Sequence, residues 1–132
     1  MGVVRFVADE QALQIFFEQL KPFAPMKLKE LWVEEDRCIS IKCVANNIDL
    51  KIKFEPFPYK GQLGFKPIKV FAGGINVDIS PSLGLFSGMI NNFLKAKKSL
   101  VQAKIEGKTI VIPVQCIAAG ISGKEVIISV RI

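Results

Sequence analysis

The sequence predicts an α+β fold in which a strongly curved antiparallel β-sheet wraps around one or two amphipathic helices. Two observations support this prediction. Several segments alternate apolar and polar residues, which is typical of strands with one buried face. Two other segments repeat apolar residues at intervals of three and four, which is typical of amphipathic helices. Strands with a single apolar face form antiparallel sheets that bury this face under helices.

The first predicted helix follows Asp9, because an aspartate carboxylate accepts hydrogen bonds from the free N–H groups of a first helical turn. Pro22 and Pro25 end this helix, since proline has no N–H to donate. The apolar residues of the helix share one face: Leu13, Phe16, Phe17 and Leu20. We expect this face to pack on the sheet.

The second predicted helix has Ser80 as its N-cap and Pro81 at its first position. Its apolar residues form a broad stripe: Leu83, Leu85, Phe86, Met89, Ile90, Phe93 and Leu94. Three lysines follow directly: Lys95, Lys97 and Lys98. An apolar face beside lysines suits a lipid-lined groove or a membrane surface, whereas the simpler interpretation is that the helix only fills the concave face of the sheet.

The strand alternation is clearest in residues 48–55, where Ile, Leu and Phe alternate with Asp, Lys and Glu. The same alternation occurs in residues 39–43, 75–79 and 126–132. Residues 54–59 contain two prolines and three aromatic residues, and we expect a loop there.

The length of 132 residues predicts a single domain, residues 1–132. Residues 39–45 and 112–118 align without gaps, and each segment follows a turn, a strand and an apolar-striped helix. The domain is therefore interpreted as two helix-plus-hairpin halves, about residues 8–54 and 80–132. Two similar hairpins on one sheet are the alternative interpretation.

Histidine is absent from the sequence, which restricts the functions that we expect. Its absence removes the usual general base, the commonest metal ligand and every pairing of a catalytic serine or cysteine with histidine. We therefore predict no enzymatic activity, no catalytic residues, no metal and no cofactor, with catalysis by lysine and carboxylate groups as a minor alternative. Cys38, Cys43 and Cys116 lie among Ile and Val residues and are predicted to be buried, reduced thiols.

The formal net charge is +6, and it comes from lysines that follow residue 50. These lysines alternate with apolar residues on strands and lack the planar forks of arginine, so nucleic acid is not the expected partner. An anionic membrane surface suits them better. The acidic run of Glu34, Glu35 and Asp36 is predicted to be a hydrated hairpin turn with ordinary pKa values.

The N-terminal residues 1–7 are too short for a signal peptide, because Asp9 and Glu10 follow them. No apolar run reaches the roughly 20 residues that a membrane-spanning helix needs. The expected location is the cytoplasm, with peripheral contact to a membrane.

Four segments occur in a recognisable order: a helix that opens at residues 8–13, a strand pair at 31–41, a "G-x-L-x-x-x-P" strand at 61–70, and a hairpin at 103–112 after the second helix. The strand pair turns at Glu34, Glu35, Asp36 and Arg37. This order resembles the small bacterial members of the tubular lipid-binding (TULIP-like) superfamily. The resemblance implies a curved sheet around a long helix, with an apolar groove for acyl chains.

These observations together predict a non-enzymatic protein that binds a lipid, a fatty-acid-like molecule or another apolar ligand in a groove between sheet and helix. The predicted headgroup or membrane contacts are Lys95, Lys97 and Lys98. The alternative is a protein–protein interaction or assembly module with a filled core, with the aromatic residues at 57 and 59 as the contact. The oligomeric state is open and allows a homodimer. The predicted ligand-binding residues are Phe17, Phe57, Tyr59, Phe86, Met89, Ile90 and Phe93.

Overall fold

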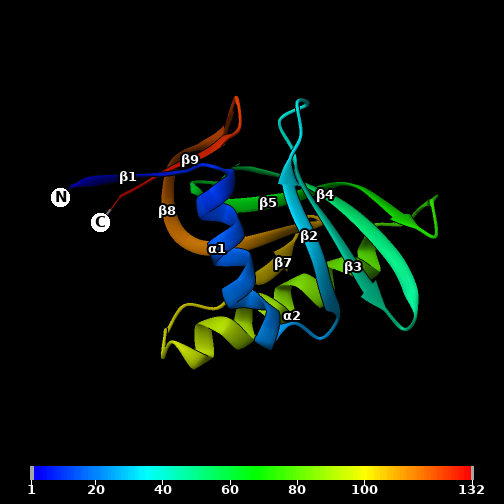
Figure 1. Cartoon of the computed structure of the whole chain (residues 1–132). Helices are drawn as coiled ribbons and strands as arrows, with labels where there is room; N and C mark the ends of the chain where they lie inside the picture. The colour runs from blue at the N-terminus through cyan, green and yellow to red at the C-terminus, as the bar shows by residue number, and fades with distance from the viewer. Residues whose placement is uncertain (1, 132) are drawn as a thin grey trace.

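The computed structural model describes residues 2–131 (Figure 1). Two α-helices, one short 3-10 helix and nine strands occur in this range. In chain order they are β1 (Val3–Ala8), α1 (Glu10–Leu20), η1 (Lys21–Phe23), β2 (Lys27–Val33), β3 (Ile39–Ala45), β4 (Ile48–Tyr59), β5 (Gln62–Ala72), β6 (Ile75–Val77), α2 (Ser80–Ala96), β7 (Lys104–Glu106), β8 (Thr109–Ser122) and β9 (Glu125–Arg131).

The nine strands of the described residues form one antiparallel sheet with the main order β1-β9-β8-β5-β4-β3-β2. The short strands β6 and β7 pair with β5 and β8 beside this path. Strand β8 connects the two parts of the sheet, because its first half pairs with β5 and its second half with β9. The predicted α+β class with an antiparallel sheet and helices is confirmed.

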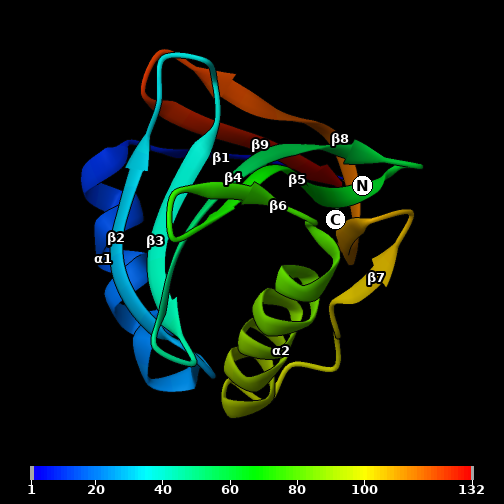
Figure 2. The ribbon, with the colours of Figure 1, turned by 90° about the vertical axis from the view of Figure 1, so that its right-hand side faces the viewer.

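The predicted strong curvature of the sheet is wrong, because the sheet is not strongly curled. The end strands β1 and β2 remain unpaired with each other, since α1 lies beside β2 and its side chains bond to the β2 edge. Figure 2 shows α1 beside β2 and α2 beside β7. The helices therefore cover a sheet that stays open.

The prediction of a loop at residues 54–59 is also wrong, because β4 continues through this segment. The N–H positions of residues 56 and 58 lie on the same strand edge, so both prolines lack a donor on the same side. Strand β3 pairs with β4 only as far as Phe54, whereas β5 pairs with β4 as far as Tyr59. The strand tolerates the two prolines because the N–H groups they lack would point away from β5, toward an edge that β3 no longer covers.

The helix starts follow local side-chain chemistry. Asp9 is the N-cap of α1 as predicted, and its carboxylate accepts a hydrogen bond from the Ala12 N–H at 2.8 Å. At α2 the predicted N-cap is wrong by one residue, because Ile79 occupies the cap position. The carboxylate of Asp78 accepts from the Ser80 N–H at 3.1 Å, which lets Ser80 become the first helical residue.

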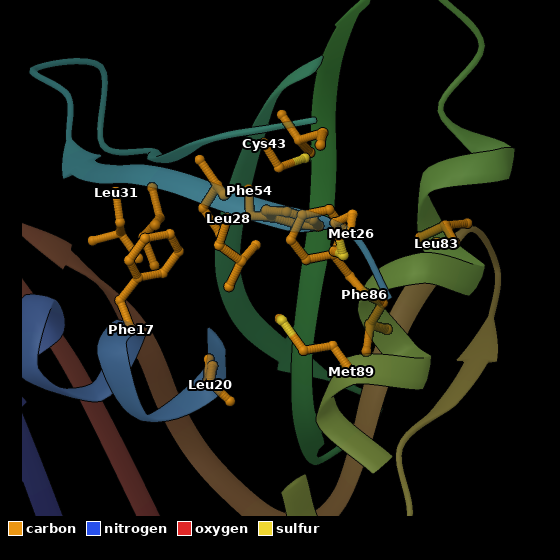
Figure 3. Packing of buried hydrophobic residues seen from close by; sticks show 14 of the residues in the cluster. Phe17, Leu20, Met26, Leu28, Leu31, Cys43, Phe54, Leu83, Phe86 and Met89 are labelled. Atoms are coloured by element: carbon orange, nitrogen blue, oxygen red, sulfur yellow. The ribbon is translucent and has the colours of Figure 1, made fainter. Parts of the chain in front are cut away.

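The hydrophobic core lies between one face of the sheet and both helices (Figure 3). From α1, Phe17 and Leu20 point into it, and from α2, Phe86 and Met89 do so. The sheet contributes alternate residues of neighbouring strands. In register these include Leu31, Ile41, Ile52 and Val70, which are all buried.

Strand β6 departs from the predicted alternation, because Ile75 and Val77 are both exposed. It consists of three residues that pair with β5, and it lies beside the main strand order rather than within it. Among residues 2–131, neither helix has the combination of length and hydropathy that crossing a membrane requires.

Candidate functional site

Three of the predicted ligand-binding residues meet in the hydrophobic core. Phe86 is only 2% exposed, and Phe17 and Met89 are buried to a similar degree. The Phe86 ring packs edge-on against Phe54 of β4, with 5.0 Å between the ring centroids. Figure 3 shows Phe17 extending from α1, and Phe86 and Met89 extending from α2, toward the other side chains of the core. The region predicted to be a ligand groove is therefore filled by the side chains of the core around these three residues.

Phe93 belongs to a more exposed group at the junction of α1, η1 and α2. It packs edge-on against Phe16 at 5.5 Å and against Phe23 at 5.7 Å, and we call these three residues the aromatic cluster. Phe16 is exposed, whereas Phe93 and Ile90 are half-buried and pack against the core. The aromatic cluster thus links Phe93, which packs against the core, to the exposed Phe16.

Phe57 and Tyr59 lie apart from the other predicted ligand-binding residues. They occupy the last part of β4 and pack against each other with 5.9 Å between their ring centroids. Gly64 and Gly107 lie directly against these rings, and a Cβ at Gly107 would come within 2.8 Å of the Tyr59 hydroxyl. Both aromatic side chains are half-buried in this packing, so they present little free surface.

Two surface hollows also lie away from α2. The larger, about 590 Å³, is open and lies over β2, β3 and β4, where Lys29, Lys42 and Lys51 line it. The smaller, about 340 Å³, lies between the β4–β5 turn and the junction of β8 with β9. No residue of α2 lines either hollow.

The C-terminus of α2 is held by a Schellman motif. The Ser99 N–H donates to the Leu94 carbonyl at 2.9 Å, and the Lys98 N–H donates to the Lys95 carbonyl at 3.0 Å. Lys98 takes the left-handed conformation at φ 58°, where glycine is most often found. The motif fixes the direction in which the chain leaves the helix.

The loop that follows is clamped at its other end by Asn91. The Asn91 side chain accepts from the Ala103 N–H at 2.6 Å and donates to the Ala103 carbonyl at 2.9 Å. Ala103 is buried, so the loop returns to the protein at this residue. We call residues 95–102, from the last residues of α2 to this clamp, the α2 tip.

Leu100 lies in the α2 tip and is 100% exposed. The sequence contains four lysines and no carboxylate between Asp78 and Glu106. Lys95, Lys97 and Lys98 are all exposed, and the Lys97 ammonium lies 5.6 Å from the centroid of the Phe93 ring. The structure thus places the three predicted lysines beside an apolar residue that the sequence analysis did not identify. The available signal in the sequence was a leucine two residues after the last of three lysines.

A second charged group lies on the outer face of the sheet, where the acidic run was predicted to be an ordinary turn. Glu34 accepts a hydrogen bond from the Trp32 Nε1–H at 3.1 Å and pairs with Lys53 at 2.9 Å and with Lys51 at 3.3 Å. Burial raises the pKa of Glu34, but the hydrogen bonds from Lys53, Trp32 and Lys51 outweigh it and lower the pKa to about 2. Only 22% of the Glu34 side chain is exposed. The prediction of ordinary pKa values is therefore wrong for Glu34.

The three cysteines are buried and free, as predicted. Burial raises the pKa of Cys43 to about 11 and also raises the pKa values of Cys38 and Cys116. Within residues 2–131 no three Cys, Asp or Glu side chains are grouped closely enough to hold a metal ion.

Comparisons with protein-family models, with curated proteins and with solved structures give no match to this chain.

Proposed function

We propose that this protein is a non-enzymatic lipid-binding module that attaches to anionic membrane surfaces through the α2 tip. In this proposal Leu100 enters the interface between headgroups and acyl chains, and Lys95, Lys97 and Lys98 contact anionic headgroups. The observation that carries it is the fully exposed leucine, held at both ends of its loop, beside three unpaired lysines of the described structure. The resemblance to the tubular lipid-binding superfamily is part of the same proposal.

The expected attachment is weak and reversible. Each lysine near an anionic surface contributes about 1 kcal/mol, so the three lysines contribute about 3 kcal/mol. Transfer of Leu100 out of water adds about 1.5–3 kcal/mol if the side chain is fully buried in the interface. Because both clamps order the loop before it binds, little conformational entropy opposes this step.

We place the lipid at the surface because an acyl groove beneath α2 would require Phe86 and Met89 to leave their packed positions. These side chains fill the space between α2 and the sheet, and a large cavity there would have to be opened against the loss of their contacts. The α2 tip needs no such rearrangement.

Sedimentation with lipid vesicles tests the proposal. We expect binding to vesicles that contain phosphatidylserine, none to pure phosphatidylcholine, and weaker binding as salt increases. The triple variant Lys95→Gln, Lys97→Gln, Lys98→Gln should bind roughly 100-fold more weakly. Its matched control replaces three exposed lysines elsewhere: Lys27, Lys29 and Lys66.

Leu100→Ser should weaken vesicle binding about 10-fold or more without changing stability, because the side chain contacts only solvent. Ile75→Ser is its control, since Ile75 is also a strongly exposed apolar residue and lies on β6. Equal binding by the Leu100 and Ile75 variants, or no binding of the unaltered chain to phosphatidylserine vesicles at low salt, would contradict the proposal.

An assembly module with a filled core is the second candidate function. It is favoured by the dense packing around Phe86 and Met89. The contact predicted for it, at Phe57 and Tyr59, is half-buried against the protein's own glycines, so an assembly surface has to be sought elsewhere. A chain that binds no vesicles but self-associates would favour this function.

A further inference from the structure

Strand β1 has one edge that pairs with β9 and one edge that no strand of the described residues covers. The pairing with β9 runs from Val3 to Ala8 without a register shift, so β1 is a regular strand over its whole length. Its free edge therefore presents an orderly row of unpaired N–H and C=O groups, which is a template for another strand.

The other end strand, β2, is protected in several ways. A register shift between Leu28 and Glu30 interrupts its edge. The Val33 N–H donates to a Glu10 carboxylate oxygen at 2.8 Å, and Gln14 of α1 donates to the Leu31 carbonyl. Side chains from α1 thus occupy backbone groups that a foreign strand would need.

Strand β1 carries almost none of the features that natural proteins use to block an edge. It contains no proline and no bulge, and Arg5 is its single charged residue. Val3, Phe6 and Val7 are exposed large apolar side chains. An exposed, regular, apolar edge of this kind associates with a partner strand or aggregates.

We propose that β1 of one chain pairs antiparallel with β1 of a second copy, so that the sheet continues across a two-fold axis at Val7. Charge selects this register. An axis at Arg5 places two arginines opposite each other, and an axis at Phe6 places Arg5 opposite Val7. The axis at Val7 places Arg5 opposite Asp9 of the second copy.

Other properties of the strand fit this register. Asp9 has extended backbone angles, φ −76° and ψ 177°, so it continues the line of β1. Neither Arg5 nor Asp9 forms an ion pair among the described residues. Phe6 lies opposite Ala8 of the second copy, where the small side chain leaves room for the ring. The strand is self-complementary, which is what a symmetric dimer requires.

Oxidative cross-linking tests the register directly. Directly opposed residues of an antiparallel pair have Cβ atoms about 4.5–5.5 Å apart, near enough for a disulfide after small adjustments. Val7→Cys should form a disulfide-linked dimer in several-fold higher yield than the control Ile15→Cys on α1. The control is stringent, because Ile15 is 61% exposed and Val7 only 49%. The native cysteines are buried and should not contribute.

A yield from Val7→Cys no higher than from Ile15→Cys would overturn the proposed register. Phe6→Cys should cross-link less than Val7→Cys, and the reverse order would move the axis to Phe6 and likewise overturn it.

Sedimentation equilibrium of the full chain, without lipid, tests the dimer itself. We expect a reversible dimer that Arg5→Asp weakens at least 10-fold, since two pairs of aspartates then face each other. Asp9→Asn should weaken it less, because asparagine keeps the α1 N-cap and removes only the charge. Lys29→Asp on the edge of β2 is the matched control and should leave the dimer unchanged. A chain that stays monomeric up to about 1 mM, a concentration at which even weak dimers are populated, would overturn the proposal.

Discussion

Apolar side chains in α2 and in the loop that follows it lie in opposite environments. In the middle of the helix, Phe86 and Met89 are buried against the sheet, whereas beyond its end Leu100 is fully exposed beside lysines. The apolar residues of α2 and the exposed Leu100 therefore have separate roles. The buried part holds the fold together, and the α2 tip is free to contact something else.

Phe86→Ala is expected to produce the largest effect, a loss of about 3–5 kcal/mol in the free energy of unfolding, because it removes a fully packed ring. Phe93→Ala should cost less, since Phe93 is only half-buried. Urea unfolding measures both values. If Phe86→Ala costs less than about 1 kcal/mol and the unaltered chain takes up a fluorescent fatty acid, α2 covers an open groove. That result would contradict the role of Phe86 as a packed core residue.

The lysines differ in the same way, because Lys53 on the sheet forms ion pairs whereas the lysines of the α2 tip form none with the described residues. Glu34→Gln should therefore cost about 1–3 kcal/mol at pH 7, measured by urea unfolding, whereas Lys97→Gln should change stability by less than about 0.5 kcal/mol. Glu35→Gln, at an exposed neighbouring position, is the control.

The pH dependence gives the sign of the Glu34 effect. The folded-state pKa of Glu34 is about 2, below its ordinary value of 4.5, so this carboxylate stabilises the fold fully above pH 4.5. Its contribution decreases as the pH falls from about 4.5 to about 2, because the unfolded chain takes up the proton first. A difference between the unaltered chain and Glu34→Gln that stays constant over this range would contradict the assignment.

The smallest expected effect, from Lys98→Gly, separates stability from binding at a single residue. Glycine relieves the left-handed conformation at this position, so we expect a gain of about 0.5 kcal/mol in the free energy of unfolding. Loss of one lysine should weaken binding to phosphatidylserine vesicles about 5-fold. Lys98→Gln removes the charge and keeps a non-glycine residue in the left-handed conformation, so it should weaken binding without changing stability. A parallel change of stability and binding in both variants would mean that the α2 tip acts only through the fold.

Local sequence patterns predicted both helices and most strands correctly, because these elements depend on apolar spacing and on caps such as Asp9. They misjudged the segment around Pro56, since the tolerance for proline depends on where β3 ends beside β4. They also misjudged Glu34, whose low pKa depends on Lys51 and Lys53 from a neighbouring strand.

The candidate site was predicted only in part. The sequence alone predicted a membrane-contact role for the lysines at 95, 97 and 98. Leu100 became a candidate contact only because the structure leaves its side chain completely exposed. The loop that carries Leu100 returns to the protein at the Asn91 clamp, a contact between residues 12 positions apart. Phe57 and Tyr59 share an aromatic composition with the helix stripe, yet they lie in a different part of the sheet.

The α+β class, the antiparallel strands and the positive, histidine-free composition follow from the sequence, because alternation, helical spacing and charge are properties of short segments. Three other features follow only from the packing of the described residues: the openness of the sheet, the free edge of β1 and the exposure of Leu100. These features depend on which segments meet. The side chains of α1 cover the edge of β2, whereas the outer edge of β1 has no partner strand among the described residues, and no local pattern specifies such a choice between distant edges.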